Sequence, residues 1–153
     1  MAKKGRTSVV IDTYALLSMA YGEVGSKAKK VLEEIRRGKV IGVLPVTVIY
    51  EYIVHWHRGR IPALKSIEEV ITFPSTYFKV ENLTLSDWIK AAETKYYGDK
   101  LLREAEDQSL RDRSLSIVDS TIIALALRLR VPIVSGDRDL TYVARSMGVK
   151  AIW

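Results

Sequence analysis

The sequence predicts an α/β protein with a parallel β-sheet that is covered by helices on both faces. Short apolar runs bounded by turn residues are typical of buried strands. Segments with helical periodicity separate these runs, and strands that alternate with helices favour parallel pairing. The strands are expected at about residues 8–12, 40–44, 77–83, 132–135 and 149–152. The length of 153 residues favours a single domain over residues 1–153.

The helices follow from apolar residues spaced three and four apart and from capping residues next to them. Helices are expected at residues 14–20, 27–37, 46–57, 63–72, 117–130 and 140–147. Another long helix is expected to begin near Asp87, with Ser86 or Thr84 as its cap and an interruption at 96–99. The charged run 100–113 is compatible with a continuation of that helix.

The composition is that of a soluble globular protein, with 48% hydrophobic and 27% charged residues. The absence of cysteine excludes disulfides, thiolate catalysis and cysteine-ligated zinc. No apolar run approaches the length of a membrane span, and no signal peptide is apparent, so we expect a cytoplasmic protein without membrane contact. Asn82 and Gln108 are the only residues of their types, and this depletion with abundant charge is typical of a thermophile protein.

The chain is basic, with a net charge of +6 and a pI near 9.5. Basic residues recur from Lys3 and Lys4 to Arg128 and Arg130. A basic protein can hold a polyanion through phosphate contacts. The alternative is that these side chains are the solvated faces of helices.

The segment 117–130 is apolar on nearly every side, which is typical of a buried helix. Asp119 lies in its first turn, on the same side as Ile122 and Ala126. One interpretation is structural, because Ser116 and Asp119 have the spacing of a helix-capping pair. The other is a functional carboxylate, which requires further carboxylates at the same place.

Such carboxylates follow two of the expected strands. Asp12 ends the run 8–12, and Asp137 follows the run 132–135. Ligands of open α/β sheets bind at the carboxyl ends of the strands, where both residues are expected. Both positions also fit simple turns.

A further carboxylate, Glu51, belongs to a polar stripe on the otherwise apolar helix 46–57. Thr47, Glu51 and His55 are four residues apart and share one face. Converging carboxylates repel one another unless cations neutralise them, and oxygen ligands select Mg²⁺ or Mn²⁺. His55 and His57 lie two residues apart and diverge on a helix, so they do not form a zinc pair. Glu51 on an exposed amphipathic edge is the alternative.

Taken in order, four motifs resemble those of PIN domains. They are VVIDT at 9–13, T-x-x-x-E at 47–51, LSIVDSTIIALAL at 115–127 and IVSGDRDL at 133–140. The resemblance implies a three-layer α/β/α fold and a metal-dependent endoribonuclease that leaves 5′-phosphate and 3′-hydroxyl ends. It also implies roles for particular residues: Asp12, Glu51, Asp119 and Asp137 as catalytic metal ligands, Thr13 and Ser135 as supporting hydroxyls, and Asp139 as an accessory acid.

Two kinds of PIN protein are compatible with these motifs. Many small members resemble VapC-type toxins, which implies an antitoxin protein as partner and a homodimer; others process ribosomal RNA. A catalytically weak RNA- or protein-binding module is the third alternative. Arg138 is a candidate for orienting RNA, although phosphate contacts give no sequence specificity. The segment 95–113 is longer than the resemblance predicts.

Two other classes of protein fit less well. A haloacid-dehalogenase-like phosphatase needs a second aspartate two residues after Asp12, where the chain has Tyr14. A receiver domain needs adjacent acidic residues at one strand end and a lysine on a late strand. The Ser-Gly-Asp that ends the run 132–135 does not fit that pattern.

Overall fold

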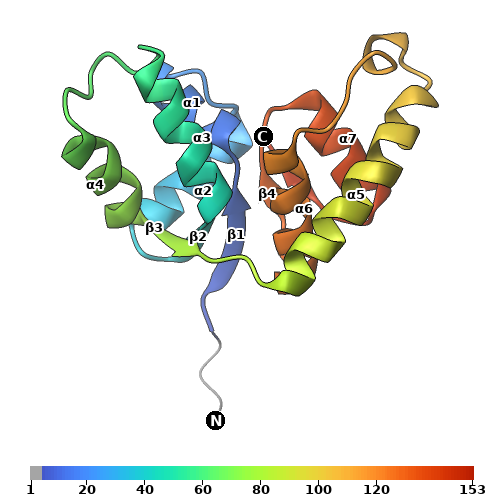
Figure 1. The fold of residues 1–153 in the computed structure, drawn as a ribbon. Coiled ribbons are helices and arrows are strands. Elements are labelled where there is room, and N and C mark those ends of the chain that lie inside the picture. The colour runs from blue at the N-terminus through green and yellow to red at the C-terminus, as the bar shows by residue number, and fades with distance from the viewer. Residues whose placement is uncertain (1–4) are drawn as a thin grey trace.

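A five-stranded parallel sheet forms the centre of the protein (Figure 1). The computed structural model describes residues 5–153, so Lys3 and Lys4 lie outside the described residues. The strands stand in the order β3-β2-β1-β4-β5. Their bounds are β1 (Thr7–Ile11), β2 (Val40–Pro45), β3 (Phe78–Glu81), β4 (Ile133–Val134) and β5 (Ala151–Ile152). The predicted fold class is confirmed.

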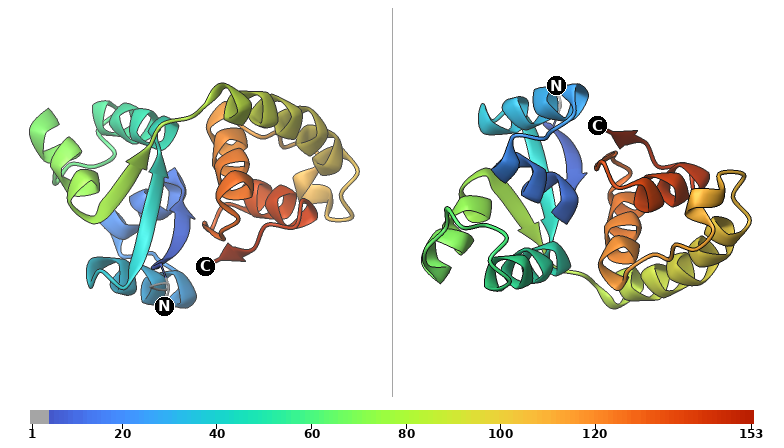
Figure 2. Two further views of the ribbon diagram at one scale, coloured as in Figure 1. Left: turned by 90° about the horizontal axis from the view of Figure 1, so that it is seen from below. Right: turned by 90° about the horizontal axis from the view of Figure 1, so that it is seen from above.

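Helices cover both faces of the sheet, with α1 to α4 on one side and α5 to α7 on the other (Figures 1 and 2). Their bounds are α1 (Thr13–Tyr21), α2 (Ser26–Arg36), α3 (Val46–His57), α4 (Ile67–Tyr77), α5 (Leu85–Arg103), α6 (Ile117–Leu129) and α7 (Arg138–Ser146). Within residues 5–153, none of these helices combines the length and the apolar character that a bilayer crossing requires.

The order of the strands creates a switch point between β1 and β4. The chain runs from β1 outward to β2 and β3, then crosses over to β4 and β5 on the other side. The crevice at the carboxyl ends of such neighbouring strands is where open α/β sheets bind ligands. Val10 and Ile11 of β1 are fully buried, and α6 packs against β1, β2 and β4. Asp12 and the turn after β4 therefore lie at this switch point.

The region around Pro74 differs from the prediction. We expected a turn at 73–76 before a strand from Tyr77, but α4 continues to Tyr77 with Pro74 inside it. Hydroxyls of Thr72, Ser75 and Thr76 each donate to the carbonyl four residues earlier, which adds hydrogen bonds around the proline. The helix also begins at Ile67 rather than near 63, with Ser66 as its cap.

The predicted interruption at 96–99 is wrong, because α5 runs unbroken from Leu85, capped by Thr84, to Arg103. Gly98 is a packing position: a Cβ there would lie 2.5 Å from Leu115 Cδ1. The charged run does not continue the helix beyond Arg103, and the next regular structure is a short 3₁₀ helix, η1 (Gln108–Leu110).

Candidate active site

Asp12 lies at the junction of β1 and α1 and is only 2% exposed. Its carboxylate accepts a hydrogen bond from the Ala15 backbone N–H at 2.7 Å and another from the Ser135 hydroxyl. Burial raises the pKa of Asp12 to about 8, and the charges of Asp119 and Asp137 add to the rise, while the two hydrogen bonds oppose it. Within residues 5–153, Asp12 forms no ion pair. Asp12 is thus a buried acid without a cationic partner in the described part of the chain.

Ser135 links the ends of β1 and β4. Its side chain is fully buried, donates to Asp12 and accepts the Asp137 backbone N–H at 2.9 Å. Asp137 in turn caps α7, because its Oδ1 accepts the N–H groups of Asp139 and Leu140 at 2.9 and 3.1 Å. One hydroxyl therefore fixes the relative positions of two of the predicted acidic residues.

Asp119 completes the capping box of α6, in which Ser116 is the N-cap, and it also lies near other carboxylates. Its N–H donates to Ser116 Oγ at 3.0 Å, and its Oδ2 accepts the Ser116 N–H at 3.4 Å. Burial raises the pKa of Asp119 to about 7, and the charges of Asp137 and Glu51 contribute to the rise. The two interpretations of Asp119 from the sequence are thus compatible.

Glu51 reaches the site from α3. One turn before it, the Thr47 hydroxyl hydrogen-bonds the Thr121 hydroxyl of α6 at 2.7 Å, which holds α3 against the helix that carries Asp119. Within residues 5–153, Glu51 forms no ion pair. Its charge is close enough to raise the pKa of Asp119.

The charges of these carboxylates thus raise one another's pKa values, as seen at Asp12 and Asp119. Their side chains are nevertheless too far apart to surround a single ion. In the described part of the chain, no three acidic or histidine side chains are close enough to hold one ion together. Two observations nevertheless fit a hard divalent cation. The donors are carboxylate oxygens without cationic partners, and the buried hydroxyl of Thr13, next to Asp12, has no hydrogen-bond partner within residues 5–153.

Asp139 and Arg138 make contacts of a different kind. Both oxygens of Asp139 accept hydrogen bonds from Arg113 Nε, at 2.8 and 2.9 Å, so a cation already balances this carboxylate. Arg138 binds Asp107 and Ser109. The segment 104–113 is therefore attached to the start of α7. Arg113 was missed in the sequence, because no local pattern distinguishes it from its charged neighbours.

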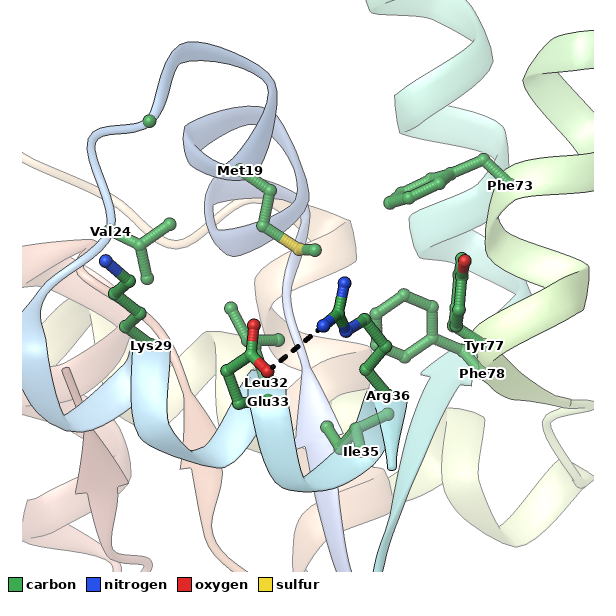
Figure 3. Close-up of a pocket in the computed structure, with 11 residues that line it drawn as sticks. Met19, Val24, Lys29, Leu32, Glu33, Ile35, Arg36, Phe73, Tyr77 and Phe78 are labelled. Atoms are coloured by element: carbon green, nitrogen blue, oxygen red, sulfur yellow. Dashed lines mark ion pairs between the residues drawn. The ribbon is translucent and has the colours of Figure 1, made fainter. Parts of the chain in front are cut away.

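A cavity of about 480 Å³ lies elsewhere, between α2, α4 and the end of α1 (Figure 3). Leu32 and Ile35 of α2 and Phe73 of α4 give it an apolar lining, and Glu33 pairs with Arg36 at its rim. None of the four predicted site carboxylates lines it. It is separate from the candidate active site.

The protein is an α/β protein with an open parallel sheet. Carboxylates that raise one another's pKa values lie at its switch point, at the carboxyl ends of the strands. A family model described as the PIN domain matches residues 9–146. The chain belongs to the PIN domain family. PIN domains are generally nucleases.

Solved structures agree with this assignment. The structure of VapBC-1 from nontypeable Haemophilus influenzae matches with a TM-score of 0.62 and 12% identity over 95% of this chain and 96% of that one. The structure of PAE2754 from Pyrobaculum aerophilum matches with a TM-score of 0.58 and 16% identity over 96% of this chain and 92% of that one. The structure of Mycobacterium tuberculosis VapC20, a sarcin-ricin loop cleaving toxin, matches with a TM-score of 0.55 and 18% identity over 87% of this chain and 92% of that one. At these identities the likeness establishes the fold. A comparison with curated proteins gave no match.

Proposed function

We propose that this protein is a divalent-metal-dependent endoribonuclease in which Asp12, Glu51, Asp119 and Asp137 hold Mg²⁺ or Mn²⁺. The observation that carries the proposal is the placement of Asp12, which is buried, and Asp119, which is half-buried, beside other acidic groups without a cationic partner in residues 5–153. Burial and the neighbouring acidic groups raise the pKa of both carboxylates. Ionising neighbouring carboxylates away from water costs free energy, and a bound cation offsets this cost.

The residues of the chain prepare this site in distinct ways. Ser135 donates to Asp12 and so favours its ionised form, which is the form that binds metal. The cap made with Ser116 fixes Asp119 at the start of α6. A bound divalent ion lowers the pKa of a coordinated water and stabilises charge on an attacked phosphate.

RNA is the substrate that we propose. The net charge of +6 favours a polyanion, and cationic side chains stand on two sides of the acidic site. On the α7 side, the hydrogen bond to Asp139 raises the pKa of Arg113, and the negative charge of Asp137 raises it further. On the α3 side, Arg60 hydrogen-bonds His55, which lies one turn after Glu51. The products expected for this family carry a 5′-phosphate and a 3′-hydroxyl.

Within the family, we propose a VapC-type toxin that acts as a homodimer with an antitoxin protein as its partner. The fold shared with VapBC-1 and VapC20 supports this choice. A ribosomal RNA-processing nuclease and a catalytically weak binding module are the alternatives. A small gene for a DNA-binding antitoxin next to this gene would favour the toxin, and light scattering on the purified chain tests the dimer.

The activity is tested with labelled single-stranded RNA. We expect cleavage in Mg²⁺ or Mn²⁺, none in excess EDTA, and a loss of at least about 100-fold in Asp12→Asn. Glu93→Gln is the matched control, because Glu93 is an exposed acidic residue of α5 paired with Lys90. Undiminished cleavage in excess chelator would exclude the metal-dependent mechanism. Full activity in Asp12→Asn would exclude Asp12 as a ligand.

A further inference from the structure

Two aromatic rings lie beside the candidate active site. Tyr14 follows Asp12 by two residues in the first turn of α1, and Trp153 follows β5, which pairs with β4. Their ring centroids are 5.3 Å apart with an angle of 65° between the planes, so the two rings meet edge to face. Segments from opposite ends of the chain thus form one aromatic pair.

Both rings rest on Gly136, the residue between Ser135 and Asp137. A Cβ at this position would lie 2.5 Å from Trp153 Cε2 and 2.7 Å from Tyr14 Cε1. No side chain fits there without displacing a ring, so glycine is required for the contact itself. The aromatic pair is therefore in direct contact with the turn that carries Ser135 and Asp137.

The two rings differ in their exposure. Trp153 is partly buried and packs against the hydrophobic core, whereas the Tyr14 residue is 46% exposed. The Tyr14 hydroxyl has no hydrogen-bond partner in residues 5–153. A purely structural role would account for Trp153, but it leaves unexplained an exposed tyrosine ring at the edge of a buried acidic site.

Exposed aromatic rings next to cationic groups are how proteins hold single-stranded nucleic acids, because each unpaired base has a face that can stack on a ring. We propose that Tyr14 stacks on a nucleobase that flanks the phosphate held at the acidic site, and that Trp153 positions the Tyr14 ring. The choice of RNA as ligand rests on the function proposed above. Stacking of this kind tolerates any base, so the platform favours unpaired nucleotides over a particular sequence.

Binding is measured by fluorescence anisotropy with labelled single-stranded RNA in EDTA, where the metal-dependent reaction is suppressed. Tyr14→Leu removes the ring and is expected to weaken binding by about tenfold. Tyr14→Phe retains the ring and should stay within about twofold of wild type, as should Tyr96→Leu. Tyr96 is the matched control, because it is a 70% exposed tyrosine on α5.

A scan with one abasic nucleotide at successive positions locates the stacked base. The affinity of the wild type should fall about tenfold when the abasic nucleotide occupies one particular position in the RNA. Tyr14→Leu, which already lacks the ring, should lose little further affinity at that position. If Tyr14→Leu folds poorly, the same scan with wild type and Trp153→Leu gives the test, since the loss at that position should shrink when Trp153 no longer positions the ring. Equal affinities of Tyr14→Leu and wild type, or abasic losses that do not depend on Tyr14 or Trp153, would overturn the proposal.

The stacking proposal and the nuclease proposal fail separately. Wild type that binds RNA through Tyr14 but does not cleave it in Mg²⁺ supports the platform and contradicts the nuclease. Cleavage by wild type with an unchanged KM in Tyr14→Leu contradicts the platform alone. Wild type that binds no single-stranded RNA in EDTA overturns the platform, and cleavage in Mg²⁺ then tests the nuclease independently.

Discussion

The side-chain hydroxyl of Ser135 donates a hydrogen bond to the carboxylate of Asp12, 123 residues earlier in the chain. The same hydroxyl oxygen accepts the Asp137 N–H. Since β1 and β4 are neighbours, this one side chain ties together the carboxyl ends of the two strands that flank the switch point. It is also the main interaction that opposes the raised pKa of Asp12.

Ser135→Ala should therefore weaken metal binding more than it weakens folding. Without the donor, the pKa of Asp12 rises further, and the metal competes with a more tightly held proton. We expect Mg²⁺ affinity and RNA cleavage to fall by about 10- to 100-fold, measured by calorimetric titration and by cleavage rates. Ser146→Ala is the control, because within residues 5–153 the exposed Ser146 hydroxyl of α7 bonds only the Tyr142 carbonyl. Unchanged Mg²⁺ affinity in Ser135→Ala would separate this hydrogen bond from the metal site.

The stability of the metal-free protein should fall as pH rises. Folding raises the pKa of Asp12 to about 8 and that of Asp119 to about 7, whereas both are near 4 in the unfolded chain. The contribution of these two carboxyl groups to stability is fully present below about pH 4 and is lost as pH rises through their folded-state pKa values. At about 1.4 kcal/mol per pKa unit, the loss amounts to several kcal/mol between pH 4 and pH 8.

Urea unfolding in EDTA across this pH range measures the effect. Asp12→Asn should flatten the slope, because asparagine does not titrate, and saturating Mg²⁺ at pH 8 should restore stability to wild type but much less to the variant. Stability that increases from pH 4 to pH 8 in EDTA would contradict the raised pKa values.

Asp119→Asn separates the two roles of Asp119. Asparagine caps helices about as well as aspartate, so the variant should lose at most the charge–dipole contribution, about 0.3–1 kcal/mol. Removing one charge from the acidic group also relieves repulsion, so the metal-free protein should melt at the same temperature or higher. Stabilisation by Mg²⁺ and cleavage should fall steeply. Thermal melts with and without Mg²⁺, together with RNA cleavage, give the comparison. A variant that melts lower without metal but cleaves RNA at the wild-type rate would show that Asp119 acts only in capping the helix.

Local patterns were sufficient to predict where Asp12 and Asp119 lie in the chain's secondary structure and the alternation of strands and helices. Asp12 ends an apolar run, and Asp119 follows Ser116 at a capping distance, so both could be placed without knowledge of the tertiary structure. Gly98 shows where such patterns fail. A glycine usually predicts a break, but here Leu115 packs so closely that only glycine fits inside the helix.

The remaining contacts depend on the tertiary structure. Tyr14 meets Trp153 only because β1 and β5 both flank β4, and no local signal in the sequence links the two ends of the chain. Arg113 meets Asp139 because the segment after α5 folds back onto α7, a segment whose charged composition gives no helical or strand periodicity. Sheet order and loop path determine these pairs.

The Arg113–Asp139 pair gives a test of the accessory acidic position. The Asp139 side chain is 10% exposed and the Arg113 side chain 55%. Arg113→Met leaves a nearly buried carboxylate without its partner, which should cost about 1–3 kcal/mol in unfolding free energy. Asp139→Asn leaves only an exposed guanidinium and should cost less. The double variant should be more stable than the sum of the two losses predicts, since residues in contact are not additive.

Cleavage by the same variants shows whether Asp139 also belongs to the metal site. If it serves only to attach the segment 104–113, Asp139→Asn and Arg113→Met should reduce cleavage to a similar extent, because each breaks the same contact. If Asp139 also contributes to metal binding, Asp139→Asn should lose Mg²⁺ affinity, whereas Arg113→Met should retain or increase it, because the carboxylate is then free of its competing cation. A Mg²⁺ titration of the two variants distinguishes these outcomes. Equal affinities in both would leave Asp139 a purely structural residue.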